Sequence, residues 1–468
     1  MRLKMIFIIN LLSAAAIVFG AGSAFAEGQP APPAAIAPPP VAPPASVVAP
    51  EPAPPLGAPA PEPPPAVAPA VPPPGPPPGP APEPQGPVIE LPSERDMPQM
   101  TLPRETAIEN PLRQQSAASA TAIGGYGELT LNAPAIGPSI IDLRRLVLFV
   151  GHNFNERIRF YSELEVEHAV ASSTDKGEFE VEQAYLDGLF TRHFNLRAGL
   201  IIMPVGIINV YHEPPTFNGV DRPDVDTLVI PSTWREAGFG AFGEITQGLS
   251  YQVYFTSGFN ANGFTAESGI ADGHQEAQLA SASTFGAVAR LTYEPVLATI
   301  FGVSAYGGTS GNTLRATVGN VPLGLFEADA RTRYRGFTAR AEVAFLFIGD
   351  TGALNTAFTT GPPEQMDAIA VASQLRGGYV EAGYDVLRLL APGTAQDVTL
   401  FFRYDYANTQ AAVAAGFTAN PTLIRYTETV GLVYRPIPEV GIKADYRRHE
   451  FGAGPSYNEF ATALTWMF

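Results

Sequence analysis

Charged side chains recur at every second residue in two separate parts of the sequence. Spacing by two puts the members of a segment on one face of a β-strand, where their fields add. Such rows attract or orient ions and dipolar solutes but contain no nucleophile, so they predict binding or conduction. The acidic row is Glu163, Glu165, Glu167, Glu178, Glu180 and Glu182. The basic row begins with Arg331, Arg333 and Arg335, which are spaced by two, and continues on later predicted strands, on faces expected to point inward, with Arg340, Arg403, Arg425, Lys443 and Arg447.

A third charged group lies in the long segment 203–234, between two predicted strands. Its members are His212, Glu213, Asp221, Arg222, Asp224 and Asp226. A connection of this length is usually functional or disordered, and its aromatic and apolar residues predict that it is packed. His212 and Glu213 are adjacent potential metal ligands, but two ligands without a third do not make a metal site, so no metal is expected.

Catalysis and cofactor binding are not expected from the rest of the sequence. The chain has no cysteine, which excludes a disulfide scaffold, a thiolate metal site and a cysteine nucleophile. It shows no G-x-S-x-G motif, and its 6 histidines are scattered without a convincing Ser/His/Asp set. The formal net charge of −17 argues against nucleic acid as a partner. We therefore expect a protein that is not an enzyme and has no cofactor.

The segments that carry these rows alternate between polar and apolar residues with a period of two, as strands do. Within 157–168, Glu163 and Glu165 fall on one face while Ile158, Phe160 and Leu164 fall on the other. Charged residues make up 16% of the chain, below the roughly 25% usual for soluble domains. Much of the surface is therefore expected to face something other than water.

This alternation predicts about sixteen strands between 121 and 468. They are 121–132, 140–153, 156–168, 178–190, 195–203, 235–245, 249–259, 284–294, 297–307, 326–334, 337–348, 378–389, 397–409, 422–435, 439–449 and 457–468. Strands of this length suit a tilted bilayer crossing, and short turns alternate with long loops. A soluble sandwich is the alternative. The expected fold is all-β, a transmembrane antiparallel β-barrel with a water-filled lumen.

Two further segments are predicted before the barrel. Residues 1–26 have a basic start, an apolar core and a small-x-small end, the pattern of a cleaved signal peptide. A single anchor helix is the alternative, but the apolar run is short for a membrane span. Of the 48 prolines, 30 lie between Gln29 and Pro98, so 27–120 is expected to be a disordered, Pro/Ala-rich periplasmic linker.

Several stretches resemble the phosphate-selective porins O and P of bacterial outer membranes. They are GGYGELTLN (124–132), FEVEQAYLDGLF (179–190), FNLRAGLIIMPVG (194–206), RYRGFTARAE (333–342), GGYVEAGYDVL (377–387) and LFFRYDYANT (400–409). The resemblance covers the predicted barrel and implies a homotrimeric, passive channel embedded in outer-membrane lipid. It also implies that the loop after the fifth strand folds into the lumen and sets a constriction. A loop that caps the barrel from outside is the alternative.

The end of the chain adds a second resemblance. Trp466 and Phe468 share one face of the last predicted strand. A terminal Phe on an amphipathic strand resembles the signal by which the barrel assembly machinery recognises outer-membrane proteins. The barrel assembly machinery is therefore an expected partner, through the C-terminal strand.

Three functions remain open from the sequence. The first is a porin for passive diffusion of ions and small hydrophilic solutes, whose acidic and basic rows form opposite walls of the lumen. For the two rows there is an alternative: the charges pair with neighbouring side chains and only keep the lumen hydrated. The second function is an anion- or phosphate-selective channel, with Arg331, Arg333 and Arg335 as a short arginine ladder. The third is a structural anchor that reaches peptidoglycan through the Pro/Ala-rich segment.

Overall fold

The computed structural model describes residues 121–170, 176–360 and 370–468. The predicted signal peptide (1–26) and the predicted linker (27–120) lie outside the described residues, and their division from the barrel stays a prediction.

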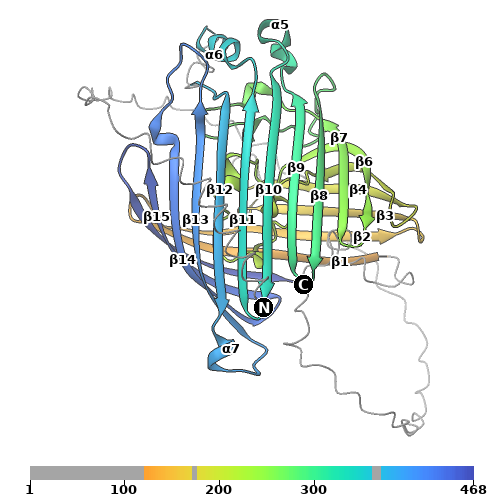
Figure 1. Cartoon of the computed structure of the whole chain (residues 1–468), viewed down its shortest axis with the longest axis vertical. Helices are drawn as coiled ribbons and strands as arrows, with labels where there is room; N and C mark the ends of the chain where they lie inside the picture. Colours follow the sequence, from red (N-terminus) through yellow and green to blue (C-terminus); the bar gives the residue numbers. More distant parts are fainter. Residues whose placement is uncertain (1–120, 171–175, 361–369) are drawn as a thin grey trace, which may run out of the picture. The chain divides into compact units, whose positions relative to one another are not determined.

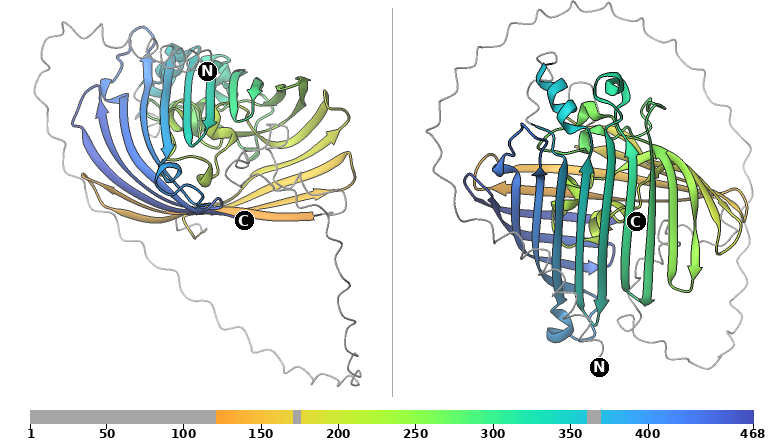
Figure 2. Two further views of the ribbon diagram at one scale, coloured as in Figure 1. Left: turned by 60° about the horizontal axis from the view of Figure 1, so that its bottom comes forward. Right: turned by 45° about the horizontal axis from the view of Figure 1, so that its top comes forward.

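Sixteen antiparallel strands form one closed sheet in which each strand pairs with its neighbours along the chain (Figures 1 and 2). The ring closes where β1 pairs with β16, with Tyr126 opposite Met467. The predicted fold class is therefore confirmed. The strands are β1 (Thr121–Pro134), β2 (Ile140–Asn153), β3 (Ile158–Glu167), β4 (Phe179–Leu189), β5 (Asn195–Ile202), β6 (Arg235–Thr246), β7 (Leu249–Ser257), β8 (Phe285–Val296), β9 (Thr299–Thr309), β10 (Pro322–Tyr334), β11 (Phe337–Ile348), β12 (Gln374–Asp385), β13 (Asp397–Ala412), β14 (Ile424–Ile437), β15 (Val440–Phe451) and β16 (Tyr457–Met467).

Short helices lie in the connections between strands. The α-helices are α3 (Ile207–Val210), α4 (Val225–Leu228), α5 (Arg315–Val318), α6 (Thr351–Thr360) and α7 (Leu387–Leu390). The 3-10 helices are η2 (Pro214–Thr216), η3 (Ala261–Gly263), η4 (Ala271–Gly273), η5 (Asn312–Leu314) and η7 (Pro421–Leu423). Within the described part of the chain, no helix has both the length and the apolar character that a membrane span requires.

The two ends of the barrel differ in their connections. Most even-numbered strands end in short turns, as at 247–248 and 335–336, whereas 203–234 and 258–284 follow odd-numbered strands. In Figure 1, α5 and α6 lie at one end and α7 lies at the other. This alternation of short and long connections is typical of outer-membrane barrels.

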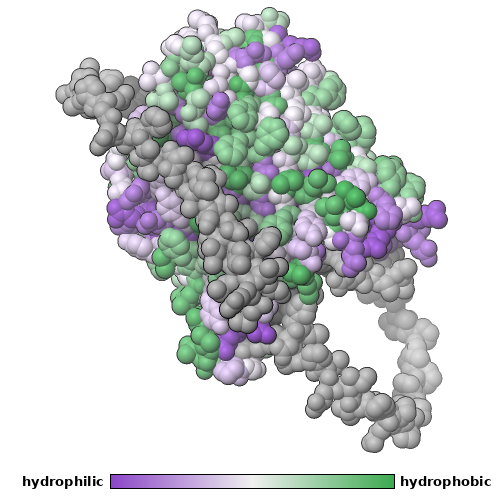
Figure 3. All heavy atoms as spheres, viewed as in Figure 1, coloured by the Kyte–Doolittle hydropathy of each residue, from purple (hydrophilic) through white to green (hydrophobic). Residues whose placement is uncertain are grey.

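Apolar side chains cover the outer face of the sheet. The exposed fractions of Ile158, Leu186 and Phe402 are 44%, 48% and 46%. Hydrophobic side chains gather over the strands on the face shown in Figure 3. The inward neighbours Glu163 and Arg403 are buried. This arrangement is apolar outside and charged within, so the soluble sandwich is wrong and the outer face suits lipid.

The start of β10 differs from the prediction. It begins at Pro322 rather than 326, because Leu323 and Leu325 are inward and buried where the prediction assumed polar residues. The alternation that marks the other strands is therefore missing from this stretch.

The end of β12 also differs. The strand ends at Asp385 rather than 389, because the apolar run that follows turns into α7. An apolar run of this length does not by itself distinguish a strand from a helical turn.

Side chains fill part of the lumen where the sequence predicted water. Tyr306 on β9 packs against Trp234, with ring centroids 4.9 Å apart, and Trp234 packs against Phe259 at 5.2 Å. These rings belong to an apolar cluster that includes residues of 203–234, 258–284 and 310–321. The cluster attaches these loops to the inner wall.

A bulge between β3 and β4 changes which side chains face inward. Glu163 pairs with Gln183 but Leu164 pairs with Val181, so Glu182 is an extra residue. Beyond the bulge the pattern of faces is inverted, and Tyr185 is inward and 3% exposed. Strict two-residue alternation from Val181 would place Tyr185 on the outer face, but one inserted residue reverses every later side chain.

Candidate functional site

The connection from β5 to β6, residues 203–234, lies within the ring of strands (Figure 2). Asn209 holds the two ends of this loop together. The side-chain Nδ2 of Asn209 donates to the Met203 carbonyl at 2.8 Å, and its Oδ1 accepts from the Trp234 amide at 2.6 Å. The inward turn requires Gly206, whose φ is +79°. A Cβ on Gly206 would lie 2.5 Å from Oε1 of Glu342, so no larger residue fits.

Hydrogen bonds join this loop to the far wall of the barrel. The Ile207 amide donates to Glu342 on β11 at 2.9 Å, and the Val220 amide donates to Asp445 on β15 at 2.7 Å. Nζ of Lys443 donates to the carbonyls of Pro214 (2.7 Å) and Gly219 (2.8 Å). The loop therefore lies across the lumen and contacts inward side chains of several strands.

Asp221 joins the loop to two basic strands. Its Oδ1 accepts from Arg144 at 2.6 Å, its Oδ2 accepts from Arg447, and Oδ2 also accepts from Asn132 at 3.0 Å. Burial alone would raise the pKa of Asp221, but the guanidinium groups of Arg447 and Arg144 outweigh burial and lower it. The carboxylate is therefore charged and bridges β2 and β15.

Arg222 and Asp224 are also held by nearby groups. Arg222 donates to Ser232 and, at 2.8 Å, to Thr233. Oδ2 of Asp224 accepts from Thr427 at 2.9 Å. Both residues are half-buried. Arg222 is held by hydroxyl groups of the loop itself, and Asp224 is held by β14.

Asp226 lies deeper and is 2% exposed. Neither of its carboxyl oxygens has a hydrogen-bond partner within the described structure. The pKa of Asp226 is raised to about 7, because burial and the nearby carboxylate of Asp405 outweigh the opposing charge of Arg222.

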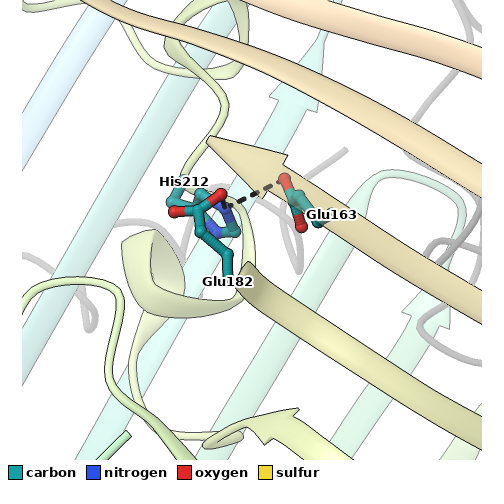
Figure 4. A group of neighbouring side chains, drawn as sticks. All are labelled: Glu163, Glu182 and His212. Carbon is teal, nitrogen blue, oxygen red and sulfur yellow. Dashed lines mark ion pairs between the residues drawn. The ribbon is translucent and has the colours of Figure 1, made fainter. Parts of the chain in front are cut away.

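His212 meets two members of the acidic row (Figure 4). Its Nε2 lies 3.5 Å from Oε1 of Glu163 and 3.6 Å from Oε2 of Glu182. Burial alone would lower the pKa of His212, but the charges of Glu182 and Glu163 raise it well above its ordinary value. Glu213, the neighbour considered in sequence, is not in this cluster.

The acidic row is divided by its surroundings. Glu163, Glu165 and Glu182 are buried, and Glu167 and Glu180 are half-buried. Glu180 pairs with Arg235 at 2.5 Å. Glu178 is exposed and lies one residue before β4, so its place on the inner wall stays a prediction. The two-residue spacing of the glutamates is the reason that the sequence predicts a strand from 178 onward.

The basic row is engaged by carboxylates and by the loop. Arg403 donates to Asp405 at 2.8 Å, and Arg447 donates to Asp445 at 3.0 Å. Arg340 donates to the Thr216 carbonyl at 2.5 Å. The predicted inward Arg425 is half-buried on β14. Most of these charges therefore pair with neighbouring groups, which is the alternative to two opposite charged walls.

The three arginines at the end of β10 do not form a continuous ladder. The guanidinium of Arg331 lies 3.8 Å from the ring centre of Tyr211, and Arg333 lies 3.7 Å from Asp397. Arg335 has a φ of +49° and lies in the turn 335–336, off the strand face. The predicted row ends early because the strand ends at Tyr334.

A cavity of about 380 Å³ lies between the loop and the wall formed by β1, β2 and β13–β16. Sequence reasoning missed several of its residues. Arg144 and Arg145 are consecutive, and a bulge that pairs Glu128 with Arg145 but Leu129 with Leu143 lets both line the cavity. An adjacent arginine pair in an amphipathic strand is the one sequence signal for this bulge. The lining is Glu128, Arg144, Arg145, Phe217, Asp221, Arg222, Asp224, Thr227, Ser232, Arg403, Thr427, Arg447, His449 and Glu459.

These features define a class. A closed antiparallel barrel of sixteen strands, apolar outside, with a charged loop inside, is a transmembrane β-barrel of the porin type. OmpF of Salmonella typhi, solved in complex with daunomycin, has this fold. It is 12% identical, the match covers 74% of this chain and 97% of that chain, and the TM-score is 0.51. The outer membrane channel DcaP of Acinetobacter baumannii matches 76% of this chain and 99% of its own at 12% identity, with a TM-score of 0.49.

A relative is found at the level of sequence. An uncharacterised protein of Aquifex aeolicus (strain VF5) is 33% identical over 352 residues, which cover 74% of this chain and 80% of that protein. The chain belongs to the same family as that protein. No family model matches the chain.

Proposed function

We propose that the protein is an outer-membrane porin for passive diffusion of ions and small hydrophilic solutes. The observation that carries this proposal is the cavity beside the lumen loop, because charged groups of both signs line a space inside an apolar cylinder. Solutes that retain water pass such a lining at low cost, whereas apolar solutes gain nothing from it. Homotrimer formation, insertion through Trp466 and Phe468, and membership of the phosphate-selective porin family are part of the same proposal.

Conductance tests the proposal directly. The full chain, folded in detergent and added to planar bilayers, is expected to give conductance steps that rise in proportion to KCl concentration. Circular dichroism confirms that the added protein is a folded β-barrel. Folded protein that inserts without conductance would overturn the proposal and leave the structural anchor, whose Pro/Ala-rich segment lies outside the described residues.

An anion-selective channel is the second candidate. It is favoured by the five arginines around the cavity, whose charge exceeds that of the four carboxylates there. The arginines are Arg144, Arg145, Arg222, Arg403 and Arg447. The reversal potential in a KCl gradient decides between the two candidates, and block of chloride current by millimolar phosphate would indicate phosphate selectivity within the second.

Asp221→Asn is expected to shift ion preference toward anions. The change removes the carboxylate that holds Arg144 and Arg447 and keeps the side chain's shape. A unit charge about 6 Å from the ion path is worth about 0.7 kcal/mol in water for each ion, with opposite sign for chloride and potassium, so the chloride-to-potassium permeability ratio should rise about tenfold. The measurement is the reversal potential at low salt, where screening is weak.

Glu450→Gln is the matched control for Asp221→Asn. It also removes one carboxylate, but Glu450 is exposed on the outward face of β15. Its permeability ratio should equal that of the unmodified chain. An Asp221→Asn ratio that also stays unchanged would mean that the loop does not border the ion path.

A further inference from the structure

One cluster of buried side chains joins the lumen loop to the acidic strands. Glu163 comes from β3, Glu182 from the bulge of β4, and His212 from the loop just after α3 (Figure 4). Their exposed fractions are 1%, 0% and 2%. One donor atom from each residue lies within 4.8 Å of the other two. Residues 163 and 182 share a wall, and the loop brings the imidazole to them.

The cluster contains buried ligand atoms that lack a hydrogen bond. Nε2 of His212, Oε1 of Glu163 and Oε1 of Glu182 have no hydrogen-bond partner within the described structure. Each is buried, and a buried polar atom without a partner is costly. Such atoms in one place indicate a ligand that satisfies them together.

Neighbouring groups orient two of the ligands. Nδ1 of His212 lies 3.3 Å from the carbonyl oxygen of Asn209, which only accepts, so Nδ1 carries a proton. A metal ion would displace the second proton, from Nε2, and bind the lone pair that this leaves. Nε2 of Gln183 donates to the second oxygen of Glu163 at 2.5 Å. A backbone carbonyl behind the imidazole and a hydrogen bond behind the carboxylate are the usual supports of metal ligands.

The spacing also fits a small divalent cation. Zinc bonds of about 2.0–2.1 Å in tetrahedral geometry place neighbouring ligand atoms about 3.4 Å apart. The two distances from His212 Nε2 to the carboxylates are 3.5 Å and 3.6 Å. We propose that Glu163, Glu182 and His212 bind a divalent cation of the zinc type, which fixes the lumen loop to the strand wall. The fourth position is left for water or a solute atom.

Charge supports the same assignment. Glu165 is buried beside this cluster and pairs with Arg145 at 3.5 Å, and Arg145 also pairs with Glu128 at 3.0 Å. One guanidinium is thus shared between two other carboxylates. A divalent ion offsets the charges of Glu163 and Glu182, which burial makes unfavourable when left without a counter-charge.

Metal content after refolding tests the proposal. The full chain is refolded into detergent with excess Zn²⁺, because three buried ligands make later exchange slow, and unbound metal is removed by gel filtration. We expect one Zn²⁺ per chain, and with Co²⁺ instead the intense visible absorption of a tetrahedral site. His212→Asn, Glu182→Gln and Glu163→Gln should each lower the affinity at least tenfold. Glu182→Gln is nearly isosteric and keeps the test valid if His212→Asn does not fold.

His168→Asn is the matched control. Nδ1 of His168 lies 2.8 Å from Asp142, but the imidazole is 43% exposed and none of the described residues adds a third ligand to the pair. This variant should retain the full Zn²⁺ content. The proposed site would be overturned if the folded protein bound no Zn²⁺, or if all three cluster variants still bound it. His212 would then be a protonated imidazole between two carboxylates. Conductance is measured in a separate experiment. Failure of the metal-binding test therefore leaves the porin proposal standing, and absence of conductance leaves the metal site standing.

Discussion

Arg290→Ala is expected to lower the free energy of unfolding of the barrel by about 3–5 kcal/mol. Arg290 is inward on β8 and 2% exposed. Its guanidinium lies 2.7 Å from Asp329 and 3.2 Å from Glu327, and it donates to Ser304 at 2.9 Å. Alanine would leave the two carboxylates of β10 buried without this counter-charge. Denaturant unfolding in lipid vesicles, followed by tryptophan fluorescence, gives the change.

Arg448→Ala separates this effect from the loss of any ion pair. Arg448 pairs with Glu450 at 2.6 Å, but the two side chains are 52% and 50% exposed on the outer side of β15. Exposed pairs contribute at most about 1 kcal/mol. Equal effects of the two alanine variants would contradict the prediction. Adding Glu327→Gln to Arg290→Ala should recover part of the loss, since it removes one of the buried charges.

The stability of the barrel is expected to fall as the pH rises from 5 to 8, because of Asp226. Burial raises the pKa of Asp226 to about 7 in the folded chain, above the value of about 3.9 usual for an unfolded one. The folded state thus binds the proton more tightly, and the stability that this proton contributes is present at low pH and lost as the pH passes 7. A shift of this size is worth on the order of 2–4 kcal/mol.

Asp226→Asn tests this pH dependence. An amide cannot ionise, so the variant should be more stable than the unmodified chain at pH 8 and should show a flatter profile of unfolding midpoint against pH. Glu450→Gln, which changes an exposed carboxylate on the outer face, serves as the control. A profile for Asp226→Asn as steep as that of the unmodified chain would assign the slope to other groups.

The regular strands could be predicted from sequence because lipid and lumen impose opposite polarity on alternate residues. Ile158 and Phe402 on the outside, with Glu163 and Arg403 inside, follow this rule. The bulge of β4 could not be predicted, since its inserted residue continues the spacing of the glutamates and carries no polarity signal of its own. Strict alternation therefore predicts the wrong face for Tyr185.

The candidate site was predictable only in part for the same reason. The charged residues of 203–234 were recognised by type, and the length of the segment indicated that it is functional. The partner of His212 depends on the register of β3 with β4 and on the bulge that turns Glu182 inward. Likewise, Arg144 reaches Asp221 only because β2 contains an extra residue opposite β1. Contacts between distant segments follow from the assembled ring and have no local signature.

Closure of the ring between β1 and β16 has a consequence for how the chain folds. The amide and carbonyl of Gly125 exchange hydrogen bonds with Phe468 at 3.0 Å and 2.9 Å, so the first and last strands meet. Contacts this distant in sequence form slowly, because a very long stretch of chain must be ordered first. Until then, two unpaired strand edges invite association with other chains. Nascent protein in transit is therefore most vulnerable to aggregation just before its final strand docks.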